Sequence, residues 1–151
     1  MRRLSISSAL VLASVTAVFA QPAKAPRTIE ITASQQMKYD VTRIQARPGE
    51  PLHIVLKSVG DAPKAVMAHN FVLLKAGVKP LEVNNAALNA RDTDFIPPAM
   101  KDKILAYTGL AGTGETVEVT FTAPTKPGTY DYLCTFPGHY AFGMKGTLVV
   151  R

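Results

Sequence analysis

Short stretches in which apolar and polar residues alternate recur along most of the chain. Residues 28–32 and 116–121 alternate strictly, and residues 129–134 do so after a Lys-Pro-Gly turn. Alternation with period two is typical of a strand with one buried face. Further runs with strand character occupy residues 41–46, 52–56, 69–74 and 146–150. Short strands at this spacing, with Gly and Pro between them, predict an all-β fold, an antiparallel Greek-key sandwich or barrel.

One region departs from this pattern. Residues 81–90 carry two leucines, one valine and three alanines among polar residues, which fits a short amphipathic helix. The sequence Phe-Ile-Pro-Pro at residues 95–98 stops that helix. We therefore expect an insertion at about residues 78–114, with a helix, a loop and one strand at residues 104–108.

The first 20 residues form a separate segment. Arg2 and Arg3 precede an apolar run, and small residues near position 20 match a signal-peptidase site. The run is short for a membrane span, and a Pro-rich lead follows at residues 21–27. These features predict a cleaved signal peptide over residues 1–20 and a periplasmic or extracytoplasmic protein, with an uncleaved anchor as the alternative. The two arginines are also compatible with the twin-arginine route.

Composition supports one exported domain over residues 28–151. The chain is 47% hydrophobic and 19% charged, which suits a single domain with a substantial core. The formal net charge of +6 falls to +4 without Arg2 and Arg3, and the remaining Lys and Arg are scattered. Because a nucleic-acid-binding surface needs a concentrated basic stripe, we expect no nucleic-acid partner.

The single cysteine begins the sequence CTFPGHYAFGM, residues 134–144, at the end of a predicted strand. A lone thiol in an exported protein is buried and inert, paired with another chain, or bound to a metal. His139 and Met144 lie in the same loop as Cys134, and His69 begins a strand far upstream. A thiolate and two imidazoles in a trigonal plane, with a weak axial thioether, form a type 1 (blue) copper site.

Each of these residues has an ordinary explanation when it is taken alone. A strand histidine such as His69 is usually a core residue with a backbone partner, and Met144 and Cys134 are typical core residues. Pro-Gly at residues 137–138 is typical of a turn. Their coincidence in one exported β protein favours a metal site. Zinc is the rival metal, but methionine is a poor zinc ligand.

The chain resembles the cupredoxin family of small blue copper proteins, and within it the azurins and more closely the auracyanins. The segments that carry this resemblance are VMAHNF at residues 66–71, residues 84–98, GTY at residues 128–130 and residues 134–148. The resemblance covers about residues 28–151. It implies that His69, Cys134, His139 and Met144 bind one copper ion that cycles between Cu(I) and Cu(II).

Three features depart from the azurin pattern. Four residues, 140–143, separate the second histidine from the methionine, as in auracyanins and plastocyanins, whereas azurins have three. Azurins also have a glycine before the first histidine, with a carbonyl group that approaches copper, and here that residue is Ala68. The N-terminal disulfide of the azurins is absent, since Cys134 is the only cysteine.

The neighbours of these four residues have expected roles as well. We expect the Asn70 amide to hydrogen-bond across to the Cys134 loop, or simply to tie down a turn. Gly138 and Gly143 free the backbone where the loop bends. Apolar residues flank the histidines, and we expect some of them to form an exposed docking patch around the His139 ring while others pack inside. These residues are Met67, Phe136, Pro137, Ala141 and Phe142.

The export signal and the four proposed copper ligands together predict a soluble exported electron carrier. We expect a monomer with one copper ion and no substrate. The resemblance implies redox proteins as partners: cytochromes, a quinol-oxidising complex, a photosynthetic reaction centre, or terminal oxidases and reductases. A copper oxidase or nitrite reductase needs a second copper centre with more histidines, and only His53 remains. Copper storage or delivery is the alternative function, and it would favour several Met or Cys ligands close together.

Overall fold

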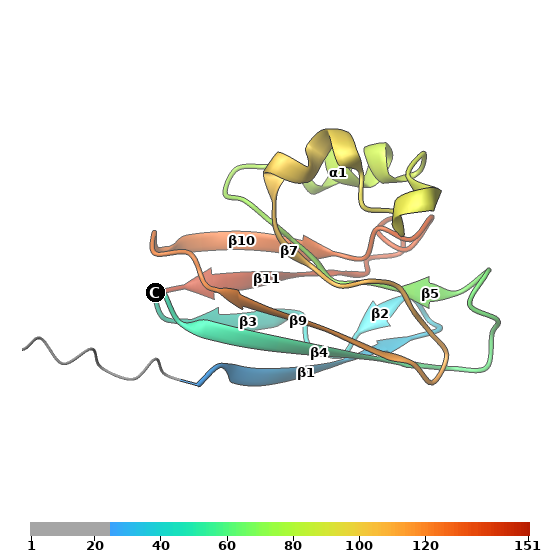
Figure 1. Ribbon diagram of the computed structural model, residues 1–151, viewed down its shortest axis with the longest axis horizontal. Coiled ribbons are helices and arrows are strands. Elements are labelled where there is room, and N and C mark those ends of the chain that lie inside the picture. Colours follow the sequence, from blue (N-terminus) through green and yellow to red (C-terminus); the bar gives the residue numbers. More distant parts are fainter. Residues whose placement is uncertain (1–24) are drawn as a thin grey trace, which may run out of the picture.

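Two β-sheets pack face to face in the computed structural model, which describes residues 25–151 (Figure 1). The first sheet contains, in spatial order, β2 (Lys38–Tyr39), β1 (Arg27–Ser34), β4 (Pro51–Val59) and β9 (Thr116–Thr122). The second contains β3 (Arg43–Ala46), β11 (Lys145–Val150), β10 (Gly128–Leu133), β6 (Val72–Leu74) and β7 (Ile104–Tyr107). A short pair is formed by β5 (Ala68–His69) and β8 (Ala111–Gly112). The β-sandwich predicted from the sequence is confirmed.

Strand pairing within the sandwich is mixed. β1 pairs with β4 in parallel, and β3 pairs with β11 in parallel, while the other pairings are antiparallel. A tight hairpin joins only antiparallel neighbours. The chain accordingly passes through β3 of the second sheet on its way from β1 to β4. The alternation of apolar and polar residues along a single strand does not show that the chain crosses from one sheet to the other between β1 and β4.

The core lies between the two sheets and is formed by the inward positions of the alternating strands. In β4, Leu52, Ile54 and Leu56 are completely buried. Across from them, the Tyr132 ring of β10 is also buried, with its centroid 4.8 Å from that of Phe71. Burial of each such side chain contributes about 1.5–3 kcal/mol, so these residues hold the layers together.

The segment expected as an insertion covers the outer face of the second sheet (Figure 1). The expected helix is present as α1 (Pro80–Ala87), with proline at its first turn, where no N–H is needed. The expected strand is present as β7. Two 3₁₀ helices, η1 (Arg91–Thr93) and η2 (Pro98–Lys103), were not predicted. A second apolar cluster joins this segment to the sheet and consists of Val72, Leu74, Val83, Ile96, Ile104 and Leu133.

The prediction of one strand over residues 69–74 is wrong, because the chain leaves the ladder at Asn70 and Phe71. His69 pairs with Ala111 of β8, whereas Val72 joins the second sheet through β6. At the break, the Phe71 N–H donates to the Thr108 hydroxyl at 3.0 Å. Two residues after His69, a side-chain partner thus replaces the partner that a strand ladder would supply.

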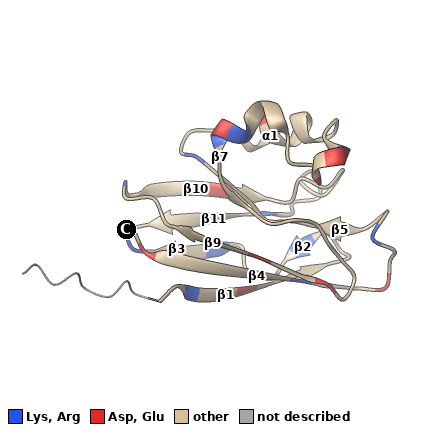
Figure 2. Ribbon diagram, viewed as in Figure 1, with Lys and Arg blue, Asp and Glu red and all other residues tan. Residues whose placement is uncertain are grey.

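Among residues 25–151, no helix has the length and apolar character needed to cross a membrane. The signal peptide expected over residues 1–20 lies outside the described residues. Along the ribbon, Lys and Arg positions are scattered and interspersed with Asp and Glu positions (Figure 2).

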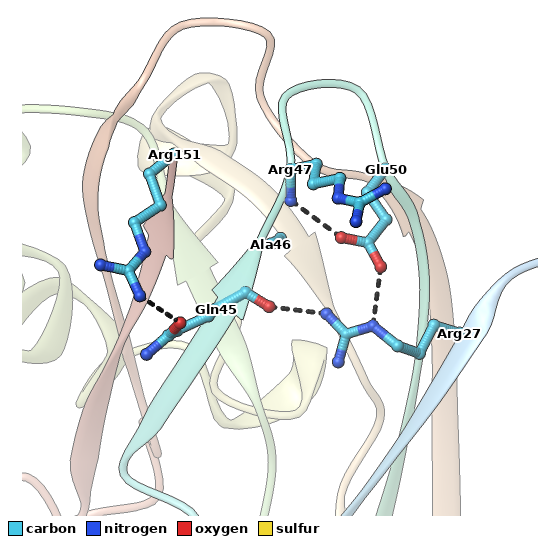
Figure 3. A pocket seen from close by; sticks show the side chains of 6 residues that line it. All are labelled: Arg27, Gln45, Ala46, Arg47, Glu50 and Arg151. Atoms are coloured by element: carbon cyan, nitrogen blue, oxygen red, sulfur yellow. Dashed lines mark hydrogen bonds and ion pairs between the residues drawn. The ribbon is translucent and has the colours of Figure 1, made fainter.

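A polar cluster closes the end of the sandwich where β11 finishes (Figure 3). Arg27 donates to Glu50 at 2.7 Å and to the Gln45 carbonyl group at 2.6 Å. The Arg47 N–H donates to the second oxygen of Glu50 at 2.8 Å, and Arg151 donates to the Gln45 side chain at 2.7 Å. These bonds fasten β1, β3 and β11 together at the end opposite to the loop that begins with Cys134.

Gly146 of β11 lies where the structure has no room for a side chain. A Cβ atom there would lie 2.3 Å from the Tyr132 hydroxyl oxygen and 2.6 Å from the Thr42 carbonyl oxygen. We predict that Gly146→Ala lowers the free energy of unfolding by about 2–3 kcal/mol, because overpacking strains the surroundings. Denaturant unfolding measures this loss. Gly109→Ala is the control, since the nearest atom to its added Cβ is 3.8 Å away. Equal losses in the two variants would contradict the prediction.

Candidate metal centre

The candidate site lies at one end of the sandwich, where two distant segments of the chain meet. His69 ends β5, and Cys134 directly follows β10. Main-chain hydrogen bonds close the loop from Cys134 to Met144. The Met144 N–H donates to the His139 carbonyl group at 3.0 Å, and the Cys134 N–H donates to the Met144 carbonyl group at 3.1 Å. Gly138 and Gly143 have φ angles of 86° and 90°, so the loop bends where glycine is favoured.

Three buried side chains converge at the base of this loop. The ligand atoms of His69, Cys134 and His139 all lie within 4.8 Å of one another. The Nδ1 atoms of the two histidines are 3.2 Å apart, and His139 Nδ1 is 3.4 Å from Cys134 Sγ. One nitrogen of each imidazole and the cysteine sulfur therefore face a common point.

These distances fit a metal ion that would be held by His69, Cys134 and His139. Bonds of about 2.0 Å to nitrogen and 2.3 Å to sulfur, at trigonal angles, separate the ligand atoms by about 3.5–3.7 Å. The observed Nδ1–Nδ1 separation of 3.2 Å and the observed Nδ1–Sγ separation of 3.4 Å are slightly shorter than these values. Two neutral rings that face each other through Nδ1 share at most one proton, whereas a cation between them uses both lone pairs. The donor set, two imidazoles and one thiol, suits copper.

Burial keeps this cluster neutral when no cation is bound. Burial raises the pKa of the Cys134 thiol to about 12, although hydrogen bonds from the Asn70 and Phe136 N–H groups and the Tyr39 hydroxyl act in the opposite direction. Burial also lowers the pKa of His69 to about 4, and burial together with the neighbouring His69 lowers that of His139 to about 4. At neutral pH the thiol is therefore protonated and both rings are uncharged. Metal binding displaces the thiol proton.

Main-chain hydrogen bonds hold Met144 next to Cys134 and His139. Its hydrogen bonds to Cys134 and His139 fix its position, and its side chain is completely buried in the same apolar cluster as Cys134. Its role as the axial ligand stays a prediction. His53, the remaining histidine, lies apart from the cluster on β4, where its Nε2 is 3.0 Å from Glu118.

Asn70 connects the two segments that carry the site. Its Oδ1 accepts a hydrogen bond from the Thr135 N–H at 2.9 Å, and its Nδ2 donates to the Thr135 hydroxyl at 2.9 Å and to the Asp94 carbonyl group at 3.2 Å. The hydrogen bonds expected between Asn70 and the Cys134 loop are present. The sequence analysis did not identify Thr135, and its position directly after Cys134 was the only available indication.

The apolar residues that flank the histidines divide between surface and interior. Phe142 is 62% exposed, Pro137 and Ala141 are exposed, and Met67 is half-buried. Val66, which the sequence analysis did not include, is 65% exposed.

Phe136 belongs to the interior instead. It packs between Phe95 and His139, with ring centroids 5.2 Å and 4.8 Å away. The Phe95 contact comes from the segment after η1, so that segment supports the loop from the side.

Comparisons with known proteins agree with this geometry. A family model described as copper binding proteins, plastocyanin/azurin family, matches residues 27–151. Auracyanin-A of Chloroflexus aurantiacus is 42% identical over 128 residues, which cover 83% of this chain and 75% of that protein. Azurin of Pseudomonas aeruginosa is 34% identical over 127 residues, covering 82% and 84%. The crystal structure of dithionite-reduced auracyanin from Roseiflexus castenholzii matches with a TM-score of 0.74 and 37% identity, covering 85% of this chain and 99% of that chain.

Truncation of Asn70 would leave several buried polar groups without their partner. We predict that Asn70→Ala lowers the free energy of unfolding by about 3 kcal/mol, since each unsatisfied buried group costs about 1–3 kcal/mol. Denaturant unfolding of the metal-free protein measures the loss. Asn84→Ala is the matched control, because the Oδ1 of this buried asparagine has no partner among the described residues. We expect it to cost about 1 kcal/mol or less, and a loss as large as that of Asn70→Ala would refute the bridging role.

Proposed function

The chain belongs to the plastocyanin/azurin family of copper-binding proteins, and we propose that His69, Cys134, His139 and Met144 are the ligands of its single copper ion. The observation that carries this assignment is the convergence of two histidine nitrogens and one cysteine sulfur within 4.8 Å in a buried cluster. The thioether of Met144, a residue buried in the same apolar cluster as Cys134, would supply the weak fourth ligand of a type 1 site.

The protein is an electron carrier and not an enzyme. Copper bound at these residues supplies one-electron chemistry by cycling between Cu(I) and Cu(II). The mixed donor set lies between the preferences of the two oxidation states, because sulfur ligands favour Cu(I) and imidazoles suit Cu(II). Main-chain hydrogen bonds close the Cys134 loop, and Asn70 fastens it to the segment of His69. Since these bonds limit movement of the ligands, little reorganisation accompanies the change of charge.

The His139 edge is the proposed port for electrons. Among the four proposed ligands, His139 is 2% exposed and the other three are completely buried. The exposed residues Pro137, Ala141 and Phe142 lie in the same loop and form an apolar docking patch, at whose edge the Lys38 ammonium group donates to the Phe142 carbonyl group. An apolar patch of this kind suits brief contacts, because a carrier must release its partner quickly.

The partners are redox proteins, and the finer assignment is part of the proposal. Cytochromes, a quinol-oxidising complex, a photosynthetic reaction centre, and terminal oxidases or reductases all fit a one-electron carrier. Residues 1–20 have the composition of a cleaved export signal, which supports a periplasmic or extracytoplasmic location. Storage or delivery of copper is less well supported, because the described residues contain a single candidate group of His, Cys and carboxylate ligands, and it is buried.

The first test is the spectrum of the mature protein loaded with Cu(II). We predict an intense band near roughly 600 nm with a small copper hyperfine splitting, and its loss in Cys134→Ser, because the band requires the thiolate. Visible absorption and EPR spectra measure both. His53→Gln is the control and should keep the spectrum, since this histidine bonds to Glu118 outside the site. Colour that survives Cys134→Ser would refute the ligand set.

The docking patch is tested by electron self-exchange between oxidised and reduced copies of the protein. Phe142→Asp should slow self-exchange about tenfold or more, because a carboxylate in an apolar contact must lose water. NMR line broadening of mixed samples measures the rate. Leu81→Asp, on α1 with 55% exposure, adds the same charge elsewhere and should have little effect. Equal rates in the two variants, with unchanged visible spectra, would argue against the patch.

A further inference from the structure

A hollow of about 460 Å³ lies at the end of the sandwich opposite to the proposed copper ligands (Figure 3). β11 starts directly after Met144 and runs to the other end of the sandwich, where Arg151 follows it. The hollow is open to water, and the residues that line it are Arg27, Gln45, Ala46, Arg47, Glu50 and Arg151. Three guanidinium groups thus share one hollow with a single carboxylate, so its surface is positively charged.

A tight turn fixes the position of that carboxylate. Residues 47–50 are Arg-Pro-Gly-Glu, and the Glu50 N–H donates to the Arg47 carbonyl group at 3.1 Å. Proline in the second position and a glycine with a φ angle of 71° in the third are typical of a type II turn. One Glu50 oxygen accepts from Arg27 Nε at 2.7 Å, and the other accepts from the Arg47 N–H at 2.8 Å. The Glu50 side chain is only 14% exposed, so this carboxylate serves the turn and Arg27.

The guanidinium groups around the hollow have more N–H donors than the protein uses. Gln45 holds two of them: its main-chain carbonyl group accepts from Arg27, and its side-chain oxygen accepts from Arg151. These two arginines reach Gln45 from opposite sides (Figure 3). The guanidinium group of Arg47 has no hydrogen-bond or ion-pair partner within residues 25–151. Each guanidinium group therefore keeps donors that are available to a bound molecule.

The chemistry of the hollow selects an anion. A cation would be repelled, and Ala46 is the only apolar residue in the lining, so apolar contacts contribute little. Guanidinium groups bind carboxylate and phosphate oxygens through pairs of N–H donors. A phosphate group has more acceptor oxygens than a carboxylate, so it can accept hydrogen bonds from guanidinium groups on several sides of the hollow at once.

We propose that this hollow is a binding site for a phosphate group, which the guanidinium groups of Arg27, Arg47 and Arg151 hold. Such a group is available from two sources, free inorganic phosphate and the headgroup of an anionic phospholipid. The inference goes beyond the proposed function and does not require copper. Because the hollow and the docking patch lie at opposite ends of the sandwich, an occupant from either source leaves the patch uncovered.

The first test is a titration of the copper-loaded, reduced protein with inorganic phosphate, followed by NMR of the main-chain N–H groups. The signals of residues 45–50 should move and saturate at millimolar phosphate, with sodium chloride of equal ionic strength as the reference. Arg47→Gln should weaken the affinity about tenfold, because hydrogen bonds to charged groups are lost. This variant should fold normally, since the guanidinium group that it removes has no partner within residues 25–151.

Arg91→Gln is the matched control. It removes the same charge from an exposed arginine of η1 that lies near Phe136 and Pro137, at the other end of the sandwich. The phosphate affinity should change less than about twofold, because salt screens distant surface charges. Equal weakening in the two variants would show a general effect of net charge and would overturn the site.

Cosedimentation with lipid vesicles distinguishes the two sources. Vesicles of phosphatidylglycerol and phosphatidylcholine should bind the unmodified protein and Arg91→Gln more than Arg47→Gln if the phospholipid headgroup is the source. Vesicles of phosphatidylcholine alone, which carry no net charge, are the reference. Saturable phosphate binding without vesicle binding would assign the site to free phosphate. Absence of both kinds of binding would overturn the proposal, and the visible spectrum of the copper-loaded protein would be unaffected by that result.

Discussion

The hydrogen bonds between Asn70 and Thr135 are the constraint on which the candidate copper site depends. They join the segment of His69 to the loop that begins with Cys134, two parts of the chain that belong to different strand ladders. Further contacts converge on the same residue: Asp94 accepts from its side chain, and Tyr39 donates to its carbonyl group. Because every polar atom of the Asn70 side chain has a partner, the two ligand-bearing segments are held at a fixed separation.

The sandwich around this point keeps the buried donor residues in place. A protonated thiol and two neutral imidazoles carry no charge, so their burial avoids the large cost of an unpaired buried ion. On one side the site rests on the core between the sheets, and on the other the segment of α1, η1 and η2 supports the second sheet through its own apolar cluster. Donor residues that are held on both sides move little when the charge of the site changes, which is the property that an electron carrier needs.

The two ends of the sandwich have different chemistry. One end carries the buried donor set, with Pro137, Ala141 and Phe142 exposed in the loop beside it. The other end is polar, with Arg27, Arg151, Gln45 and Glu50 joined by hydrogen bonds (Figure 3). The hydrogen bonds and the ion pair at this polar end fasten the strand ends together.

The sequence by itself determined most of the longer strands, the helix at α1, and the loop whose cysteine, histidine and methionine indicated copper. Strand alternation and the spacing of residues within one loop are local properties of the chain. Only the tertiary structure decided the parallel pairing of β1 with β4, the break after His69, the burial of Phe136 and the contacts of Tyr39. Each of these depends on which distant segments meet and on where a buried polar group finds its partner. Tyr39 lies in a strand too short to show a period, so its hydrogen bond with the Asn70 carbonyl group arises from packing between the layers.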